Sequence, residues 1–399
     1  MPVRQQRRLR EMPDGSWRSF EIEVPNPKST IENATQSLRG RRELEDAATI
    51  LAATPGFGFY SRVYSGVPFR PEYVAARHFV MTLPSLVCAE EELALDEDRW
   101  RSVMDGLHRL AIDGTQRVST FVPILGLRLT EPIDLGGMIL RPLSAVERET
   151  VFNDPLYGSV GRMGNDSPPE SALFIEQFLV APESELTHRR RTDAQIWNLL
   201  LALRLWTGGS LFVKAIVRDV ELGAGRSSRH GNNPPPTGPF VNLVDPAGFV
   251  AFWKKTQAAI AEPPKGLDVA LRRFTLIHDQ PRHSDRILDQ VIILEALFLD
   301  RSEKQELSYR LRMRVAHFIG DTLGDRVNNV DLINAAYKMR SAIAHGDEPS
   351  AADENTQKEL DRIIQRVLVR YLEEAATRRD RSLHQMILKD LDRRMLERA

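Results

Sequence analysis

The sequence has little cysteine: Cys88 is the one cysteine in 399 residues. A single cysteine cannot form a disulfide within the chain, and a zinc site built on thiolates needs more than one. Disulfides are typical of oxidising compartments, so this composition favours a reducing one. The basic N-terminus, MPVRQQRRLREMPDG, has no apolar core after its charges. It therefore does not fit a secretory signal, and we expect a cytoplasmic protein whose first dozen residues are disordered.

Long apolar runs and a large net charge are also missing. An apolar run such as Val291–Leu299 is interrupted by Glu295 and is too short to span a bilayer. The formal net charge is −1, so affinity for a polyanion must come from a local patch. Apolar residues make up 42 % and charged residues 27 %, which is typical of a soluble globular protein of two or three domains at this length. We expect no association with a membrane.

The common signatures of cofactor and metal chemistry do not occur. No cluster of Cys and His has metal-ligand spacing, and no Gly-x-Ser-x-Gly elbow is present. GAGRSSRHG (223–231) opens like a phosphate-binding loop, but it lacks the third glycine and a following helix, which favours a flexible loop. We therefore expect neither a metal nor a cofactor.

The first half of the chain mixes strand and helix patterns. Strand patterns cover 19–24, 119–143 and 171–181, and helical spacing covers 30–53 and 144–152. The charged segment HRRRTD (188–193) marks a change of character. We predict an α+β N-terminal domain, sensing or regulatory, over residues 1–190.

The second half is expected to form a mainly α-helical domain over residues 191–399. After a helix at 193–209 and a strand at 210–222, the predicted helices cover 245–260, 265–278, 284–300, 304–322, 328–345, 353–378 and 382–397. The breaks between these helices are short, which favours an antiparallel bundle.

The segment YKMRSAIAHGDE (337–348) places Arg340 five residues before His345. Similar spacings occur at Arg101/His108, Arg273/His278, Arg312/His317 and Arg379/His384. Spacing alone therefore carries no functional conclusion. A histidine in the last turn of a helix followed by glycine also matches an ordinary helix C-terminus.

The surroundings of this pair are more informative. Leu332, Ala336, Met339 and Ile343 predict a buried stripe, with Arg340 beside it. The nearly all-apolar helix at 284–300 contains Glu295, and a carboxylate there needs a cationic partner. Arg310 and Arg314 share one helix face at i, i+4. Two interpretations stay open: a functional constellation of these residues with Arg340 and His345, or a structural salt bridge that ties three helices together.

The segments SDRILDQVIILEALFL, ELSYRLRMRVAHFIG and AAYKMRSAIAHGD together resemble the ApeA-like branch of the HEPN superfamily. The similarity covers roughly residues 193–378, and the family motif falls on Arg340 and His345. Ser341 follows the arginine where many relatives have another polar residue, often Asn. The resemblance implies an α-helical HEPN bundle, frequently a homodimer, and in many members a metal-independent ribonuclease. Relatives of this branch are associated with anti-phage defence by abortive infection, which implies a phage-derived trigger.

This resemblance predicts an endoribonuclease in which the ribose 2′-hydroxyl attacks the adjacent phosphorus. His345 would transfer protons and Arg340 would stabilise the phosphate, with Glu295 orienting one of them. Arg310, Arg314 and Ser341 would contact the RNA. Five helical residues turn through about 500°, so Arg340 and His345 point roughly 140° apart. Unwinding near Gly346 or a two-fold dimer would reconcile them, and we favour the dimer. The alternative is a non-catalytic HEPN module that dimerises and binds a nucleotide or nucleic acid.

Overall fold

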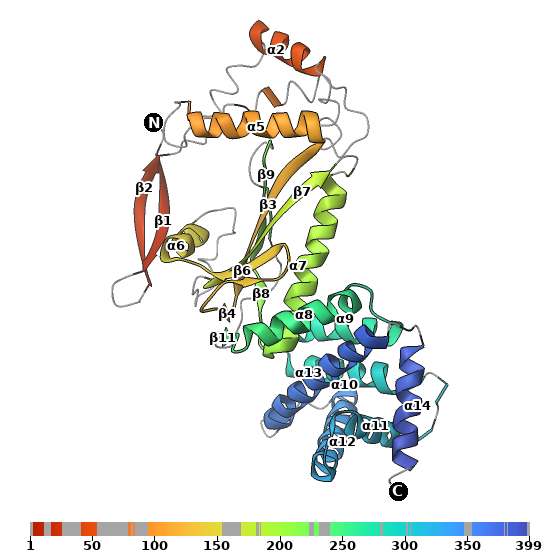
Figure 1. Ribbon diagram of the computed structural model, residues 1–399. Coiled ribbons are helices and arrows are strands. Elements are labelled where there is room, and N and C mark those ends of the chain that lie inside the picture. The colour runs from red at the N-terminus through yellow and green to blue at the C-terminus, as the bar shows by residue number, and fades with distance from the viewer. Residues whose placement is uncertain are drawn as a thin grey trace. The chain divides into compact units, whose positions relative to one another are not determined.

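The computed structural model describes residues 3–11, 17–25, 41–53, 79–80, 83, 95–153, 169–180, 183, 185–222, 227–230, 240–279, 282–300, 302–303, 305–346, 353–378, 380 and 382–396 of the chain (Figure 1). These residues form a mixed α and β structure whose paired strands are antiparallel. None of the described helices is long and apolar enough to cross a membrane.

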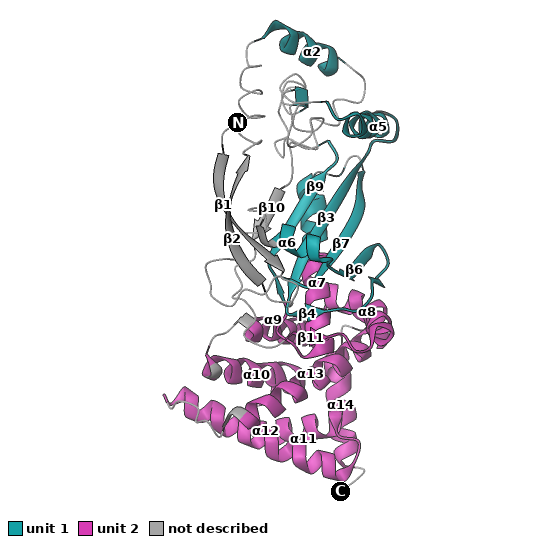
Figure 2. Ribbon diagram, turned by 90° about the vertical axis from the view of Figure 1, so that its left-hand side faces the viewer, with its two compact units in different colours: residues 1–193, 212–233 teal, residues 194–211, 234–399 magenta. Residues whose placement is uncertain are grey.

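The chain divides into two compact units (Figure 2). One comprises residues 1–193 with 212–233, and the other comprises 194–211 with 234–399. The boundary expected at 190/191 lies inside a continuous helix, α7 (Glu185–Thr207). The segment HRRRTD is part of this helix, because arginine is a good helix former and its charge does not interrupt the helix.

The first unit begins with a hairpin of β1 (Val3–Glu11) and β2 (Trp17–Pro25), so the expected disorder of the first dozen residues is wrong for β1. Helix α2 (Arg42–Ala52) lies within the helix predicted at 30–53, of which 30–40 falls outside the described residues. Helix α5 (Glu97–Asp113) has no counterpart in the sequence prediction. It starts at Asp96, whose carboxylate accepts hydrogen bonds from the backbone N–H groups of Asp98 and Arg99.

The main sheet of this unit has β3 (Thr115–Leu125) near its centre. Its strand order is β10-β9-β3-β7-β6-β5, with β8 paired to the end of β3. Its other strands are β5 (Ile133–Asp134), β6 (Met138–Pro142), β7 (Ser171–Val180), β8 (Phe212–Val213), β9 (Ala215–Val220) and β10 (Ser227–His230). The two-residue strand β4 (Leu127–Arg128) lies outside this sheet, and β11 (Val241–Asn242) belongs to the second unit. The strand predicted at 210–222 is therefore split in two. The loop predicted at 223–231 contains β10, which pairs with β9.

The two faces of this sheet differ in burial. One face carries Val118, Val122, Leu173 and Leu179, all of which are buried. On the other face, helix α6 (Ala145–Asn153) packs Val151 into a cluster with Leu143, Ala172, Ala215 and Val217, against which Phe121 and Phe174 are partly buried. This second face is the more open one, because Phe121 and Phe174 are only half-buried.

The second unit is helical. Besides the end of α7, it contains α8 (Pro246–Ala261), α9 (Lys265–Asp279), α10 (His283–Phe298), α11 (Leu307–Ile319), α12 (Leu323–Ala344), α13 (Asp353–Arg378) and α14 (Leu383–Leu396). Each corresponds to one of the helices predicted for the second half, and this part of the prediction is confirmed. Helix α8 starts at Asp245, whose carboxylate accepts a hydrogen bond from the Gly248 N–H at 2.8 Å.

Helix α10 is central in this unit, as its nearly all-apolar sequence predicts. Ile287, Val291, Leu294 and Phe298 are buried. The helix packs against α9, α11, α12, α13 and α14. An apolar helix surrounded on most sides can bury its residues all round instead of along one stripe.

Helix α12 starts five residues earlier than the sequence prediction. A capping box sets this start: Thr322 Oγ1 accepts from the Asp325 N–H, and an Asp325 carboxylate oxygen accepts from the Thr322 N–H, both at 3.1 Å. The polar segment between Thr322 and Asn328 obscured the helical spacing, while the capping residues at i and i+3 were visible in the sequence.

His278, at the end of α9, is a buried ionisable group of the second unit. Its Nδ1 lies 3.4 Å from Ser210 Oγ. Its ring packs edge-on against the Phe274 ring, with 4.9 Å between the ring centres. Burial lowers the pKa of His278 to about 3, and the nearby guanidinium groups of Arg204 and Arg286 act in the same direction. The imidazole is therefore neutral in the folded protein at neutral pH.

This neutrality predicts a pH-dependent stability. Between the ordinary value of 6.5 and about 3, the unfolded chain binds a proton at His278 that the folded chain does not. The free energy of unfolding should fall as pH falls through this window, and His278→Gln should show a smaller fall. Urea unfolding of both proteins between about pH 7 and about pH 4 measures the difference. Parallel pH profiles for the two proteins would contradict the assignment.

Candidate active site

Helices α10 and α12 pack together and bring Glu295 and Arg340 to the same place in the second unit. The buried line of α12 consists of Asn329, Ile333 and Ala336. The stripe predicted from the sequence is therefore correct at Ala336, whereas Leu332, Met339 and Ile343 are only half-buried. The buried face is rotated from the expected one toward Arg340, which continues the buried line four residues after Ala336.

Two side chains of α12 contact the Glu295 carboxylate. Arg340 Nη2 lies 3.8 Å from Glu295 Oε2, and the Tyr337 hydroxyl donates to Glu295 Oε1 at 3.2 Å. The guanidinium of Arg340 also lies 5.6 Å from the centre of the Tyr337 ring. The carboxylate in the apolar helix thus has the cationic partner that the sequence analysis required.

Arg340 is held at one end and open at the other. Its side chain is 38 % exposed, against 24 % for Glu295. One carboxylate contact at 3.8 Å leaves most of the five guanidinium N–H groups available to a ligand. The arrangement orients a cation without enclosing it.

Tyr337 is a site residue that the sequence analysis missed. Burial raises the pKa of Tyr337, and the charge of Glu295 raises it further. The phenol is therefore protonated at neutral pH and is a hydrogen-bond donor to Glu295. Its position three residues before Arg340, on the same helix face, was a usable signal.

His345 is the C-terminal cap of α12. Its backbone N–H donates to the carbonyl oxygens of Ser341 at 3.2 Å and Ala342 at 3.0 Å. Gly346 follows with φ +98°, the left-handed conformation that glycine adopts readily at a helix end. The His345 side chain is exposed, and within the described part of the chain its imidazole makes no hydrogen bond.

The helix continues from Arg340 to Ala344 and tightens at its end, where the His345 and Gly346 N–H groups donate to carbonyl oxygens three residues earlier. This end does not unwind in a way that brings the two side chains together. The change of direction at Gly346 comes after His345 and does not alter the angle between them. A separation of roughly 140° around the helix therefore holds. Of the two solutions considered for this geometry, unwinding near Gly346 does not occur in the chain as described.

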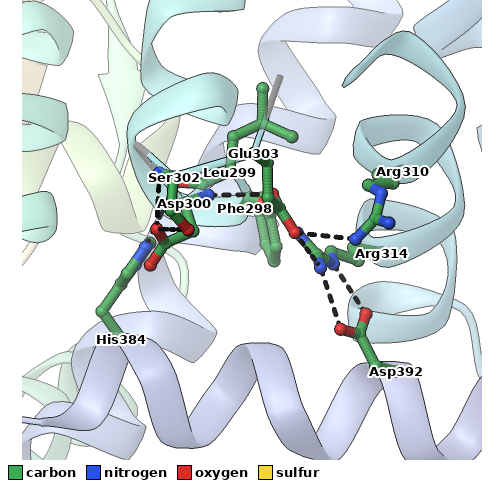
Figure 3. A network of polar contacts seen from close by, with 9 residues as sticks. All are labelled: Phe298, Leu299, Asp300, Ser302, Glu303, Arg310, Arg314, His384 and Asp392. Carbon is green, nitrogen blue, oxygen red and sulfur yellow. Dashed lines mark hydrogen bonds and ion pairs between the residues drawn. The ribbon is translucent and has the colours of Figure 1, made fainter. Parts of the chain in front are cut away.

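Arg314 lies elsewhere, in a buried ionic network (Figure 3). Its Nε and Nη2 donate to Asp392 of α14 at 2.8 and 2.9 Å, and its Nη1 and Nη2 donate to Glu303 at 2.9 and 2.7 Å. Nη1 also donates to the Phe298 carbonyl oxygen at 2.8 Å. These five bonds match the five N–H groups of a guanidinium.

The network makes Arg314 a structural residue. Its side chain is 1 % exposed. Burial acts to lower the pKa of Arg314, but hydrogen bonds to Glu303 and Asp392 outweigh it, and the pKa lies above its ordinary value. The expectation that Arg314 contacts RNA is therefore corrected, because no donor is left for a phosphate. For this residue the geometry matches the alternative of a salt bridge that ties helices together.

Arg310 and Ser341 stay accessible. Arg310 Nη1 donates to Glu303 at 2.9 Å, but its side chain is 42 % exposed. Ser341 is exposed on the last turn of α12, next to Arg340 in the chain. The described structure places neither of them in contact with Glu295, so the predicted constellation is reduced to Glu295, Tyr337 and Arg340, with His345 one turn further along α12.

Comparison with protein-family models, with curated proteins and with solved structures finds no match for this chain.

The Arg314 network predicts that substitutions of two neighbouring arginines lower the free energy of unfolding by very different amounts. Arg314→Met leaves Glu303 buried without its main partner and should lower the free energy of unfolding by about 3–5 kcal/mol. Arg310→Met, one turn earlier on the same helix, removes a half-exposed ion pair and should cost less than about 1 kcal/mol. Urea unfolding followed by helical circular dichroism compares the two, and equal losses would contradict the structural role of Arg314.

Proposed function

We propose that the protein is a metal-independent endoribonuclease of the HEPN type, with Arg340 and His345 as its catalytic residues. One observation carries the proposal: a partly exposed arginine, oriented by a half-buried carboxylate and a tyrosine, shares the end of a helix with an exposed histidine. The resemblance of residues 193–378 to ApeA-like HEPN sequences supports the same pair.

The chemistry follows from the groups present. A base removes the proton of the ribose 2′-hydroxyl, the 2′-oxygen forms a bond to phosphorus, and the bond from phosphorus to the 5′-oxygen breaks. An acid protonates the departing 5′-oxygen, which leaves a 2′,3′-cyclic phosphate and a 5′-hydroxyl. His345 is the proton-transfer group, because imidazole can accept or donate a proton near neutral pH. Arg340 stabilises the negative charge on the phosphate oxygens.

Glu295 and Tyr337 have a positioning role in this proposal. The carboxylate holds one side of the guanidinium, and the tyrosine hydroxyl fixes the carboxylate. A guanidinium that is oriented before RNA binds loses less freedom in the transition state. Ser341 and Arg310 are proposed RNA contacts at the periphery, and a phosphate at Arg310 has to compete with Glu303.

The site is proposed to be completed by a second copy of the chain. The end of α12 directs Arg340 and His345 to different sides, so one phosphate cannot readily meet both from one chain. A two-fold axis near the end of α12 would place Arg340 of one copy beside His345 of the other.

The proposed biological role comes from the resemblance. The protein would be a toxin-like effector of anti-phage defence, and RNA cleavage would halt the infected cell. The first unit would sense a phage-derived trigger or restrain the nuclease, which would keep a basal cleavage activity.

RNA cleavage in excess chelator tests the catalytic assignment. The full-length protein should cut labelled single-stranded RNA and leave 2′,3′-cyclic phosphate ends. Arg340→Ala and His345→Ala should each lower the rate by about 10²–10⁴-fold, the range for loss of an acid–base group or of transition-state charge stabilisation. Lys338→Ala, an exposed cation on the same helix, should cut at the wild-type rate.

Helical circular dichroism of each variant separates loss of chemistry from loss of folding. Cleavage that requires added metal, or that survives both substitutions, would contradict the proposal. RNA binding with no cleavage by the wild type would instead support the non-catalytic binding module.

A further inference from the structure

The more open face of the sheet in the first unit contains a groove of about 620 Å³. This volume is within the range of small-molecule sites, roughly 300–1,000 Å³. The described residues that line it come from β3, β5, β6, β7, β9 and α6. None of them belongs to the proposed nuclease site, so the groove is independent of that proposal.

The register of the strands arranges the floor of the groove in two rows. In the first row Val217 pairs with Phe121, Phe121 with Phe174, and Phe174 with Ile139. In the second row Ser119 pairs with both Asp219 and Glu176. Since neighbouring residues in register share a face of the sheet, an apolar row lies beside a polar, acidic one.

The apolar row is only partly covered. Helix α6 covers one end of this face through Val151, and the Phe121 and Phe174 rings contact each other at 4.7 Å. Ile139 remains 47 % exposed. An apolar surface that stays open inside a concave site favours a ligand with an apolar part.

The charge of the lining has one sign. Asp134, Glu147, Glu176 and Asp219 line the groove, and the described lining residues include no lysine or arginine. Glu176 is 62 % exposed and has only a long contact to Arg117, 3.5 Å. Asp134 forms no ion pair within the described part of the chain. Asp134 and Glu176, which have no close ion pair, give this concave site a negative charge that attracts positively charged ligands.

The protein already places one cation at this site. Arg141 lies 3.9 Å from the centre of the Phe174 ring, and its guanidinium donates to Glu147 at 2.5 and 3.0 Å. This internal pair shows the combination of ring face and carboxylate that holds a flat cation. Asp134 and Glu176 offer the same partner to an outside ligand.

Two other ligand classes fit poorly. A phosphate or nucleic acid would meet repulsion from Asp134 and Glu176. A metal ion needs carboxylates that converge on one point, and within the described residues no group of three or more His, Cys, Asp or Glu side chains can hold a metal. Carboxylates spread along an apolar floor match an extended ligand instead.

We infer that this groove binds a small organic cation: an amine or guanidine carried on a flat apolar body. The apolar body lies along Phe121, Phe174 and Ile139, and the charged group lies between Glu176 and Asp134. The first unit therefore has a ligand site of its own, separate from RNA.

Matched probes test this inference on the full-length protein. Tryptamine and phenethylamine are compared by calorimetry with indole-3-propionate and 3-phenylpropionate, which have similar bodies and the opposite charge. The amines should bind at least about tenfold more tightly than the acids, because each carboxylate contact changes affinity by a factor of about two to five. Glu176→Gln and Asp134→Asn should each weaken amine binding by such a factor, and the double variant by about tenfold.

Glu97→Gln is the matched control, because this exposed carboxylate of α5 does not line the groove and should leave binding unchanged. Equal binding of amines and acids, no binding of either amine, or amine binding that the double variant leaves intact would each overturn the inference. Both substituted positions in the groove are exposed, so circular dichroism should show wild-type folding.

Discussion

The second unit depends on a buried ionic network centred on Arg314. Arg314 donates hydrogen bonds to Glu303, to Asp392 and to the Phe298 carbonyl, and so connects α11 with the segment that follows α10 and with α14 (Figure 3). Burying a guanidinium to 1 % exposure is costly unless its donors are satisfied by hydrogen bonds, as those of Arg314 are. The positions of these segments are therefore coupled, because a shift of any of them would leave a buried charge without a partner. This network fixes the end of α10 next to Glu295.

Arg340 illustrates the opposite use of the same side chain. It has one carboxylate partner at 3.8 Å and remains 38 % exposed. Its guanidinium is therefore oriented, but most of its N–H groups stay available to a ligand. Tyr337 completes the arrangement by donating to the other oxygen of Glu295. In the proposed mechanism, Arg314, whose donors are all hydrogen-bonded, supports the fold. Arg340, whose donors are mostly available, binds the phosphate. Exposure and the number of hydrogen bonds separate the two roles more clearly than residue type or spacing.

Much of the helical unit could be predicted from the sequence, because apolar spacing and caps such as Asp245 act locally. The long-range partners could not be predicted in this way. Asp392 is 78 residues from Arg314, and nothing in the local pattern connects them. The prediction that Arg314 contacts RNA was wrong because its distant partner was not visible in the sequence. The need of Glu295 for a cationic partner, in contrast, followed from its apolar surroundings. In the first unit, the two-row floor of the groove depends on strand register, which the sequence of each strand does not specify by itself.

The central claim is a composite site in which Arg340 and His345 come from different copies of the chain. Mixing Arg340→Ala protein with His345→Ala protein, after exchange of subunits, tests it directly. Each mixed dimer would contain one intact site, and random exchange predicts about a quarter of the wild-type cleavage rate from two inactive proteins. No recovery of cleavage in dimers shown to have exchanged would contradict the composite site.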